Sequence, residues 1–357
     1  MDAALLHTWG NPSSLHLLGI EAECAVTKAR ETVAALLGAR EDEIVFTSGG
    51  TEANNTALLS LLTSKKRGGR VIVTAVEHPS VLETAKRLEN EGFEVVRLAP
   101  EKDGSILSES LENALTDNTV LVSMMAVNNE TGAVLPVKEA ATLVKHKVPR
   151  ALFHCDAVQA FGKLPLSVRQ YPVDLLSASA HKIHGPKGIG ILFVRKGTNL
   201  HPLLTGGGQE RGLRSGTESV PLIMGLCGAI HALGNLETHL TSRKNLWDYA
   251  TKKLLETGAV TLNSPADALP YILNISVPEF RSETLLHFLE SRGIFVSSGS
   301  ACAKGAGSHV LTAMGLEKAR VDSALRLSFS RYSTEEEIDR LCEALSDAVS
   351  TLRKVKA

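Results

Sequence analysis

The clearest clue to the architecture is the stretch Ile44-Val45-Phe46-Thr47-Ser48-Gly49-Gly50-Thr51-Glu52. Its first half is an apolar, β-branched run typical of a buried strand, and two glycines then lead into a helical pattern. Glycine lets the backbone approach a bound group closely, and a helix N-terminus favours an anion, so a phosphate fits here. The spacing does not match a Walker A loop, because no Lys follows the glycines. Taken alone, the motif favours a plain strand-to-helix turn over a phosphate site.

The rest of the first two thirds repeats this alternation of short apolar runs and amphipathic stretches. Strands are expected at 71–73, 95–98, 120–122, 152–154 and 175–176, and helices at 21–37, 81–91 and 137–145. Because the strands are apolar on both faces and alternate with helices, the pattern predicts an α/β fold with a mainly parallel central sheet covered by helices.

The last third follows a different pattern. A long helical region from 220 to about 256 precedes predicted strands at 272–277, 294–296 and 325–329, a helix at 283–292 and a closing helix. Thr334 and Glu337 have the spacing of a capping box at the start of that closing helix. A chain of 357 residues is long enough for about two domains. We therefore expect a large domain over 1–236 and a smaller α+β C-terminal domain over 237–357.

Composition excludes several classes of protein. Lys and Arg number 38 and Asp and Glu 39, and this balance argues against direct nucleic-acid binding. Five cysteines without a CxxC spacing argue against a disulfide scaffold and a zinc ribbon, and Cys24, Cys227 and Cys342 are expected in the core. Neither a secretory signal nor an apolar run of about 18 residues is found. We expect a cytoplasmic protein with no membrane association.

Polar residues directly after the predicted strands form a candidate site, because ligands of open parallel sheets bind beyond the carboxyl ends of the strands. These residues are Ser48 to Thr51, His78, Asn128, Asn129, Asp156 and Ser179 to Lys182. Lys182 suits a Schiff base with a carbonyl compound, whereas zinc binding by His181 and His184 lacks a nearby third ligand. Asp156 suits the pyridinium nitrogen of pyridoxal phosphate, although it could instead only cap the following segment.

Eight blocks of the sequence together resemble the cysteine desulfurases of the NifS/IscS kind, in the class V aminotransferase group of fold-type I pyridoxal phosphate enzymes. The blocks are Phe46-Thr47-Ser48-Gly49-Gly50-Thr51-Glu52, Glu77-His78, Val127-Asn128-Asn129-Glu130, Asp156-Ala157-Val158-Gln159, Ala180-His181-Lys182, Arg211-Gly212-Leu213-Arg214-Ser215-Gly216-Thr217, Ser297-Ser298-Gly299-Ser300-Ala301-Cys302 and Leu325-Arg326. They cover nearly the whole chain. The resemblance therefore implies the fold of a fold-type I pyridoxal phosphate-dependent transferase.

The resemblance assigns a role to each matching position. Lys182 would carry the cofactor covalently, and His78 would stack on its ring and help with proton transfer. Cys302 would attack the sulfur of the substrate. Asn129 and Arg326 would bind the carboxylate of the substrate. The remaining positions implied in cofactor binding are Asp156 at the pyridine nitrogen, Gln159 at the ring hydroxyl, and Gly50, Thr51, Ser179, His181 and a second subunit's Thr217 at the phosphate.

The implied activity is the conversion of L-cysteine to L-alanine, with a persulfide on Cys302 for transfer to an acceptor protein in iron–sulfur cluster assembly or tRNA thiolation. Thr217 implies a homodimer. Two alternatives stay open: another pyridoxal phosphate lyase or aminotransferase, such as selenocysteine lyase, and a poorly active, N-terminally truncated sulfur-transfer scaffold. The second alternative is considered because the related desulfurases have a short segment that this sequence lacks before Gly10. We therefore expect the protein to bind the cofactor but to desulfurate cysteine slowly.

Overall fold

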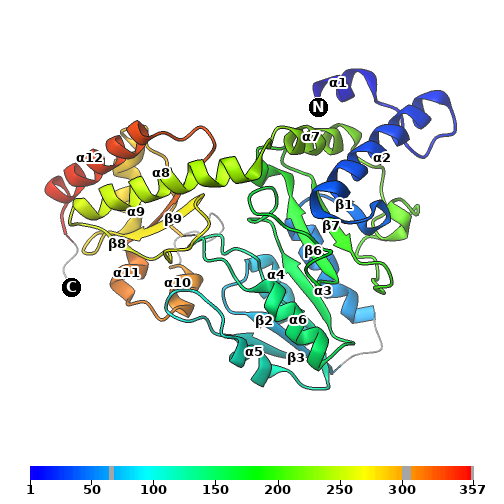
Figure 1. The fold of residues 1–357 in the computed structure, drawn as a ribbon, viewed down its shortest axis with the longest axis horizontal. Coiled ribbons are helices and arrows are strands. Elements are labelled where there is room, and N and C mark those ends of the chain that lie inside the picture. The colour runs from blue at the N-terminus through cyan, green and yellow to red at the C-terminus, as the bar shows by residue number, and fades with distance from the viewer. Residues whose placement is uncertain (64–67, 300–306, 355–357) are drawn as a thin grey trace. The chain divides into compact units, whose positions relative to one another are not determined.

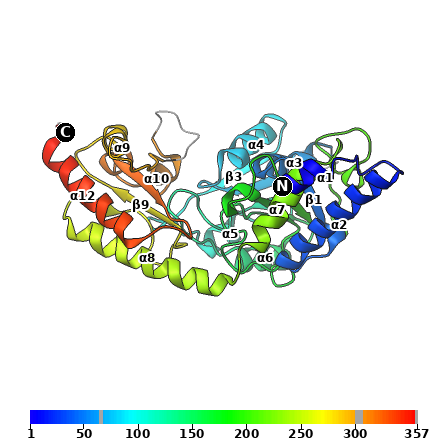
Figure 2. The same cartoon turned by 90° about the horizontal axis from the view of Figure 1, so that it is seen from above.

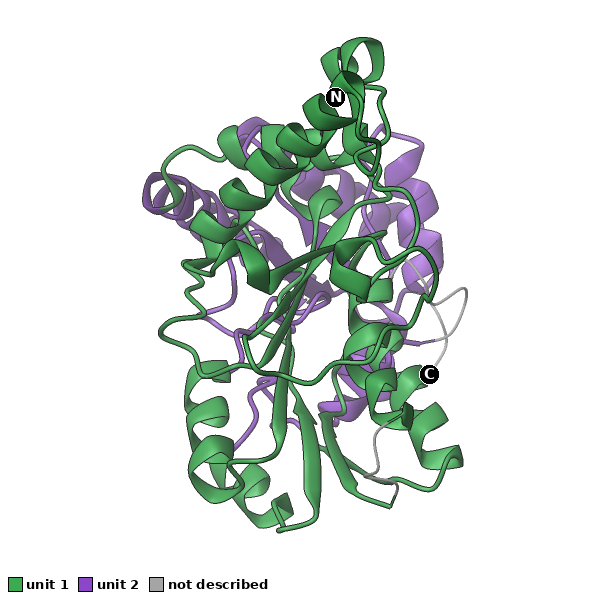
Figure 3. Cartoon of the chain, turned by 90° about the vertical axis from the view of Figure 1, so that its right-hand side faces the viewer, with its two compact units in different colours: residues 1–98, 108–126, 136–236 green, residues 99–107, 127–135, 237–357 purple. Residues whose placement is uncertain are grey.

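The computed structural model describes residues 1–63, 68–299 and 307–354. The chain divides into two compact units, drawn in two colours in Figure 3. The first contains residues 1–98, 108–126 and 136–236, and the second contains 99–107, 127–135 and 237–357. The second unit thus includes two short segments that the sequence-based division placed in the first domain.

The first unit contains a seven-stranded sheet with the strand order β1-β7-β6-β5-β4-β2-β3. Its strands are β1 (Ile44–Thr47), β2 (Arg70–Thr74), β3 (Glu94–Leu98), β4 (Thr119–Ser123), β5 (Leu152–Asp156), β6 (Leu175–Ser179) and β7 (Gly190–Val194). All run in one direction except β7, which is antiparallel to both of its neighbours. The predicted mainly parallel sheet is confirmed.

Helices lie on both sides of this sheet (Figure 3). They are α1 (Asp2–His7), α2 (Leu17–Leu37), α3 (Gly50–Leu59), α4 (Pro79–Asn90), α5 (Ser108–Ala114), α6 (Val137–Lys147) and α7 (Val220–His231), with 3-10 turns η1 (Glu41–Glu43), η2 (Ser60–Thr63), η3 (Ala180–Ile183) and η4 (Glu210–Gly212). Every residue of β4, β6 and β7 is buried, as strands covered on both faces require. Helices α2 and α7 pack side by side (Figures 1 and 2).

The second unit has an antiparallel sheet in the order β10-β9-β8 and a core of its own. Its elements are α8 (Leu236–Glu256), β8 (Thr261–Leu262), β9 (Ile272–Ser276), α9 (Ser282–Glu290), α10 (His309–Ala313), α11 (Lys318–Asp322), β10 (Ala324–Ser328) and α12 (Glu335–Thr351). Trp247, Leu285 and Leu345 bring α8, α9 and α12 into this core. The predicted capping box between Thr334 and Glu337 is present.

Several expectations for individual elements are wrong. The long helix predicted from 220 to 256 is two separate helices, and Gly234 between them adopts a left-handed φ of 62°. Residues 294–296 form no strand, and only Ser297 bridges to Arg326 of β10. The strand β7 was not anticipated. Cys24 is exposed rather than in the core, because an apolar period along a helix does not reveal which face meets the sheet.

No single helix in the described ranges is long and apolar enough to cross a membrane, although α7 and α8 meet the length and composition criteria when taken together across their bend. Within the same ranges, no three His, Cys, Asp or Glu side chains are grouped so that they could hold a metal ion.

Candidate active site

The carboxyl ends of four parallel strands place four predicted site residues at one edge of the sheet in the first unit. Gly50 begins α3 after β1, and His78 caps α4 after β2. Asp156 is the last residue of β5, and Lys182 lies in the 3-10 turn that follows β6. The parallel topology therefore brings residues from four distant segments to a common edge.

The glycine turn after β1 is packed too closely for side chains. A Cβ atom on Gly50 would lie 2.6 Å from Cγ2 of Val158. A Cβ atom on Gly190 of β7 would lie 2.7 Å from Cα of Gly49, whose φ is 154°. Among the described residues no side chain caps the N-terminus of α3, a helix of 10 residues, so its first backbone N–H groups can bind an anion.

Two further predicted phosphate ligands flank this turn. Oγ of Ser179 lies 2.8 Å from Nδ1 of His181, and the Cβ of Ser179 is 3.9 Å from the position of a Cβ on Gly50. Burial, together with the charge of Lys182, lowers the pKa of His181. Thr51 is exposed at the second position of α3. Backbone N–H groups at the start of α3, two hydroxyls and an imidazole form a donor set that suits a phosphate.

We expect Gly190→Ala to destabilise the protein, because its Cβ would also lie 2.6 Å from the carbonyl oxygen of Ala178. Backbone on both sides must move, which costs about 1–3 kcal/mol in the free energy of unfolding. Urea unfolding measures this loss. The control is Gly228→Ala on α7, whose Cβ would meet nothing within 4 Å. Equal stability losses in the two variants would contradict the close packing of this turn.

The carboxylate of Asp156 is buried and hydrogen-bonded at both oxygens. Oδ1 accepts from the backbone N–H of Val158 at 2.9 Å, and Oδ2 accepts from Nδ2 of Asn54 at 2.7 Å. Burial raises the pKa of Asp156, while these two donors and the charges of His78 and Lys182 act in the opposite direction. A buried carboxylate of this kind is stabilised by a cationic N–H partner, so the residue fits the protonated ring nitrogen of pyridoxal phosphate.

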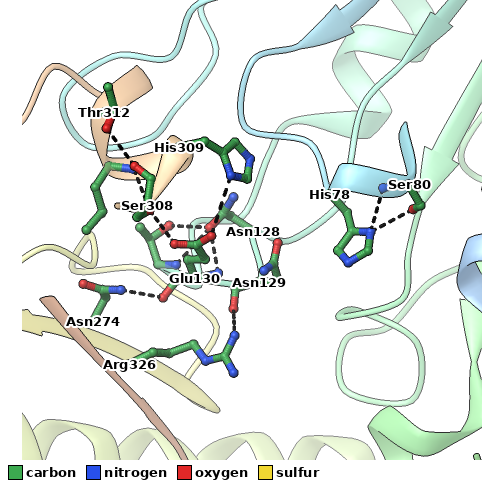
Figure 4. Close-up of polar contacts among 12 residues, drawn as sticks. His78, Ser80, Asn128, Asn129, Glu130, Asn274, Ser308, His309, Thr312 and Arg326 are labelled. Atoms are coloured by element: carbon green, nitrogen blue, oxygen red, sulfur yellow. Dashed lines mark hydrogen bonds and ion pairs between the residues drawn. The ribbon is translucent and has the colours of Figure 1, made fainter. Parts of the chain in front are cut away.

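Sequence reasoning missed Asn54 and Ser80. Nδ2 of Asn54 donates to Asp156 and, at 2.9 Å, to Oγ of Ser80. That hydroxyl lies 2.8 Å from Nδ1 of His78, whose ring is drawn in Figure 4. The sequence offered only a weak signal, because Asn54 follows the apolar Ala53 but is itself followed by the polar residues Asn55 and Thr56.

Glu77, directly before His78, is a second buried carboxyl that no sequence-based role covers. Its Oε1 accepts from the backbone N–H of Met125 at 2.7 Å and from the hydroxyl of Thr74 at 2.8 Å. Burial, with a contribution from the charge of Asp156, raises the pKa of Glu77 to about 8. The side chain therefore holds a proton near neutral pH.

We expect Glu77→Gln to gain stability over the wild type as the pH rises. The pKa is raised from 4.5 to about 8 on folding, so the stability that Glu77 contributes is present below about pH 4.5 and is lost as the pH rises to about 8. Glutamine keeps the acceptor oxygen and does not titrate. The gain between about pH 5 and about pH 8 should reach roughly 2–4 kcal/mol in urea unfolding.

The matched control for this experiment is Glu83→Gln, an exposed glutamate on the same helix α4. Its effect on the free energy of unfolding should be the same at both pH values. A pH-independent difference between Glu77→Gln and the wild type would contradict the raised pKa.

The remaining predicted cofactor ligands of the first unit differ in their surroundings. Gln159 is buried, and its Oε1 accepts from Nζ of Lys163 at 3.3 Å. Thr217 is exposed. The loop before it is held by Arg214, whose Nε donates to Glu52 of α3 at 3.0 Å. The structure thus places Gln159 beside the sheet edge and leaves Thr217 at the surface.

The two predicted substrate ligands are neighbours in the second unit. Nη1 of Arg326 in β10 donates to the backbone carbonyl of Asn129 at 3.1 Å (Figure 4), and Nη2 lies 3.4 Å from Oγ of Ser297. Oδ1 of Asn129 is buried without a hydrogen-bond partner among the described residues. The turn is shaped by Asn128, whose Oδ1 accepts from the backbone N–H of Glu130 at 2.9 Å. A guanidinium and a neighbouring amide suit a carboxylate ligand.

Cys302, the predicted nucleophile, lies outside the described residues. The four described cysteines are all free.

Comparison with known proteins identifies the family. The aminotransferase class-V family model matches residues 1–341. A cysteine desulfurase of Nostoc sp. is 45% identical over 355 residues, which cover 97% of this chain and 87% of the relative.

Solved structures agree with this assignment. A NifS-like protein superposes with a TM-score of 0.92 at 39% identity, covering 98% of this chain and 94% of its own. A structure described as SspA in complex with cysteine superposes with a TM-score of 0.82 at 36% identity, covering 93% of this chain and 94% of its own. The predicted resemblance is thus confirmed, and this chain belongs to the class-V aminotransferase family, among its pyridoxal phosphate-dependent cysteine desulfurases.

Proposed function

We propose that the protein is a pyridoxal phosphate-dependent cysteine desulfurase, which converts L-cysteine to L-alanine and retains the sulfur as a persulfide on Cys302. The observation that carries this proposal is the buried Asp156 carboxylate at the same sheet edge as Lys182 and the open N-terminus of α3. These three features suit the ring nitrogen, the aldehyde and the phosphate of the cofactor. The relatives are named cysteine desulfurases, and nothing in the comparisons supports the two alternatives.

The proposed residues bind the cofactor, bind the substrate or move a proton. Bound pyridoxal phosphate supplies an electron sink for negative charge at the Cα atom of the substrate. The amine of Lys182 takes the proton from that Cα atom. Arg326 and Asn129 hold the substrate carboxylate. Gly50, Thr51, Ser179 and His181 bind the phosphate, Asp156 the ring nitrogen and Gln159 the ring hydroxyl.

The sulfur is transferred to Cys302. Its thiolate attacks the sulfur atom of the substrate, so that an S–S bond forms while the C–S bond of the substrate breaks. The electron pair of the broken bond stays on carbon, which takes up a proton and leaves as the methyl group of alanine. The persulfide on Cys302 can then be passed to an acceptor protein.

The test is incubation of the cofactor-loaded protein with L-cysteine and a thiol reductant. Alanine and sulfide should appear in equal amounts. L-selenocysteine, tested in parallel, separates this activity from that of a selenocysteine lyase. Turnover of selenocysteine alone, or alanine without sulfide, would contradict the proposal.

We also propose that the protein is a homodimer in which Thr217 binds the phosphate at the site of the partner. The exposed position of Thr217 supports this proposal, because the hydroxyl is available to a second subunit. Two-fold dimers are the commonest soluble assemblies. Thr217→Val should weaken cofactor binding roughly tenfold, the worth of one charge-assisted hydrogen bond.

Sedimentation of the cofactor-loaded protein should give a dimer at micromolar concentration. If Thr217 acts at the site of the partner, a mixed dimer of one Thr217→Val subunit and one Lys182→Ala subunit carries both substitutions at the same site. Its other site is then fully wild type and should bind the cofactor normally. A cofactor-loaded monomer with wild-type affinity would contradict the proposal.

We further propose a sulfur-acceptor protein, either an iron–sulfur scaffold or a tRNA-thiolation enzyme, as the partner, and the cytoplasm as the location. The free thiols of Cys24, Cys155, Cys227 and Cys342 are compatible with a reducing compartment, where a persulfide relay would operate. We propose no direct contact with nucleic acid.

A further inference from the structure

A continuous chain of hydrogen bonds in the first unit joins Asp156 to His78 through Asn54 and Ser80. Asn54 uses its Nδ2 atom twice, toward Oδ2 of Asp156 at 2.7 Å and toward Oγ of Ser80 at 2.9 Å. Oγ of Ser80 lies 2.8 Å from Nδ1 of His78. Asn54 and Ser80 are both buried, with 1% and 9% of their surface exposed. The chain therefore links the proposed ligand of the ring nitrogen to the residue proposed to stack on the ring.

The direction of each hydrogen bond follows from what the atoms can donate. A carboxylate oxygen can only accept, so the amide of Asn54 must turn its nitrogen toward Oδ2 of Asp156. The second hydrogen of that nitrogen goes to Oγ of Ser80, which leaves the hydroxyl hydrogen of Ser80 for His78. The backbone N–H of Ser80 also donates to Nδ1 of His78, at 3.1 Å, and a backbone donor cannot be reversed. Nδ1 of His78 is therefore an acceptor.

The orientation of Asn54 has a cost that argues for a role. Its Oδ1 atom is buried without a hydrogen-bond partner among the described residues. Turning the amide over would bring that oxygen toward Asp156 and Ser80, but it would break both donated bonds. Buried polar atoms are rarely left unpaired, so the structure gives up one acceptor to keep two donors in place.

We propose that Asn54 and Ser80 are positioning residues that hold His78 as the neutral tautomer with its proton on Nε2. This inference deepens the proposed function and rests on it for its catalytic meaning. Because Nδ1 accepts, neutral His78 offers its Nε2–H as a hydrogen-bond donor and has no lone pair at that atom with which to act as a base. Lys182 is therefore left as the base for the Cα proton.

Nitrogen-15 NMR of the histidine rings in the cofactor-free protein tests the tautomer, with His78→Gln identifying the signals of His78. The wild type should show Nε2 protonated and Nδ1 unprotonated when the ring is neutral. Ser80→Ala removes one of two donors, so the ratio of the two tautomers should fall about twofold to tenfold. Ser80→Thr keeps the hydroxyl and should restore the ratio.

Two more variants distinguish the effect of these hydrogen bonds on His78 from a general effect on the fold. Asn54→Leu should lower the tautomer ratio and also weaken cofactor binding, because Asp156 loses a donor. The control is Asn55→Ala, which removes a donor to the backbone carbonyl of Ser80 at 3.1 Å and leaves the chain intact. Its His78 spectrum should match the wild type.

The NMR readout needs neither cofactor nor substrate, so it stands even if the proposed function fails. In the active enzyme, Ser80→Ala should lower kcat and leave KM for cysteine nearly unchanged, because Ser80 does not hold the substrate. A wild-type His78 with its proton on Nδ1, or a Ser80→Ala spectrum identical to the wild type, would overturn the inference.

Discussion

Lys182→Ala should abolish alanine formation from L-cysteine, with a loss on the order of 10⁴-fold or more. The variant loses both the amine that anchors the cofactor and the base proposed to act on the Cα proton. Lys182 lies in the turn directly after β6, and its charge partly offsets the burial that raises the pKa of Asp156. Single-turnover assays measure the loss. In the wild type, borohydride reduction and peptide mapping should place the cofactor on Lys182 alone.

The control for this experiment is Lys187→Ala, an exposed lysine in the same segment. It should keep most of the activity and the borohydride label at Lys182. Label on another lysine, or measurable turnover in Lys182→Ala, would show that the covalent anchor lies elsewhere.

Cys302→Ser should bind the cofactor and L-cysteine normally and release no sulfide above background. An alcohol is a far weaker nucleophile toward sulfur than a thiolate near neutral pH, so the transfer should fall by at least about 10³-fold. Sulfide release under reductant and the visible spectrum of the bound cofactor measure the two halves of this expectation independently.

Cys24→Ser is the matched control, because Cys24 is a free and exposed thiol. It should release sulfide at the wild-type rate. Mass spectrometry of the wild type after cysteine addition should find one extra sulfur on Cys302. Persulfide on Cys24, or wild-type sulfide release by Cys302→Ser, would mean that Cys302 is not the nucleophile.

The sequence contained enough local information to predict the sheet and its polar edge. Apolar strands that are followed by polar residues, as at Asp156 and Lys182, indicate a site at one edge of a parallel sheet. The reason is that the carboxyl ends of parallel strands meet at the same edge. The reasoning failed where local pattern is ambiguous. β7 was missed although residues 190–194 are apolar, and the helix predicted through Gly234 is broken there.

Asn54 and Glu77 were not predicted as site residues because their partners lie far away in the sequence. Asn54 contacts Ser80 at a separation of 26 residues and Asp156 at a separation of 102 residues, and no periodicity along α3 reports such partners. The sequence gives Glu77 no role beyond its position next to His78. Its raised pKa depends on burial among segments that come from distant parts of the chain.

The sequence by itself determined the α/β architecture, the family and the identities of the residues proposed for catalysis, because these depend on local patterns and on motifs of short spacing. Only the tertiary structure decided that residues 127–135 join the second unit, where Gly132 accepts a hydrogen bond from Leu269 at 2.8 Å. It also decided the direction of the hydrogen bonds from Asn54 to His78. Both depend on which backbone and side-chain donors meet in space, and a linear pattern does not contain that information.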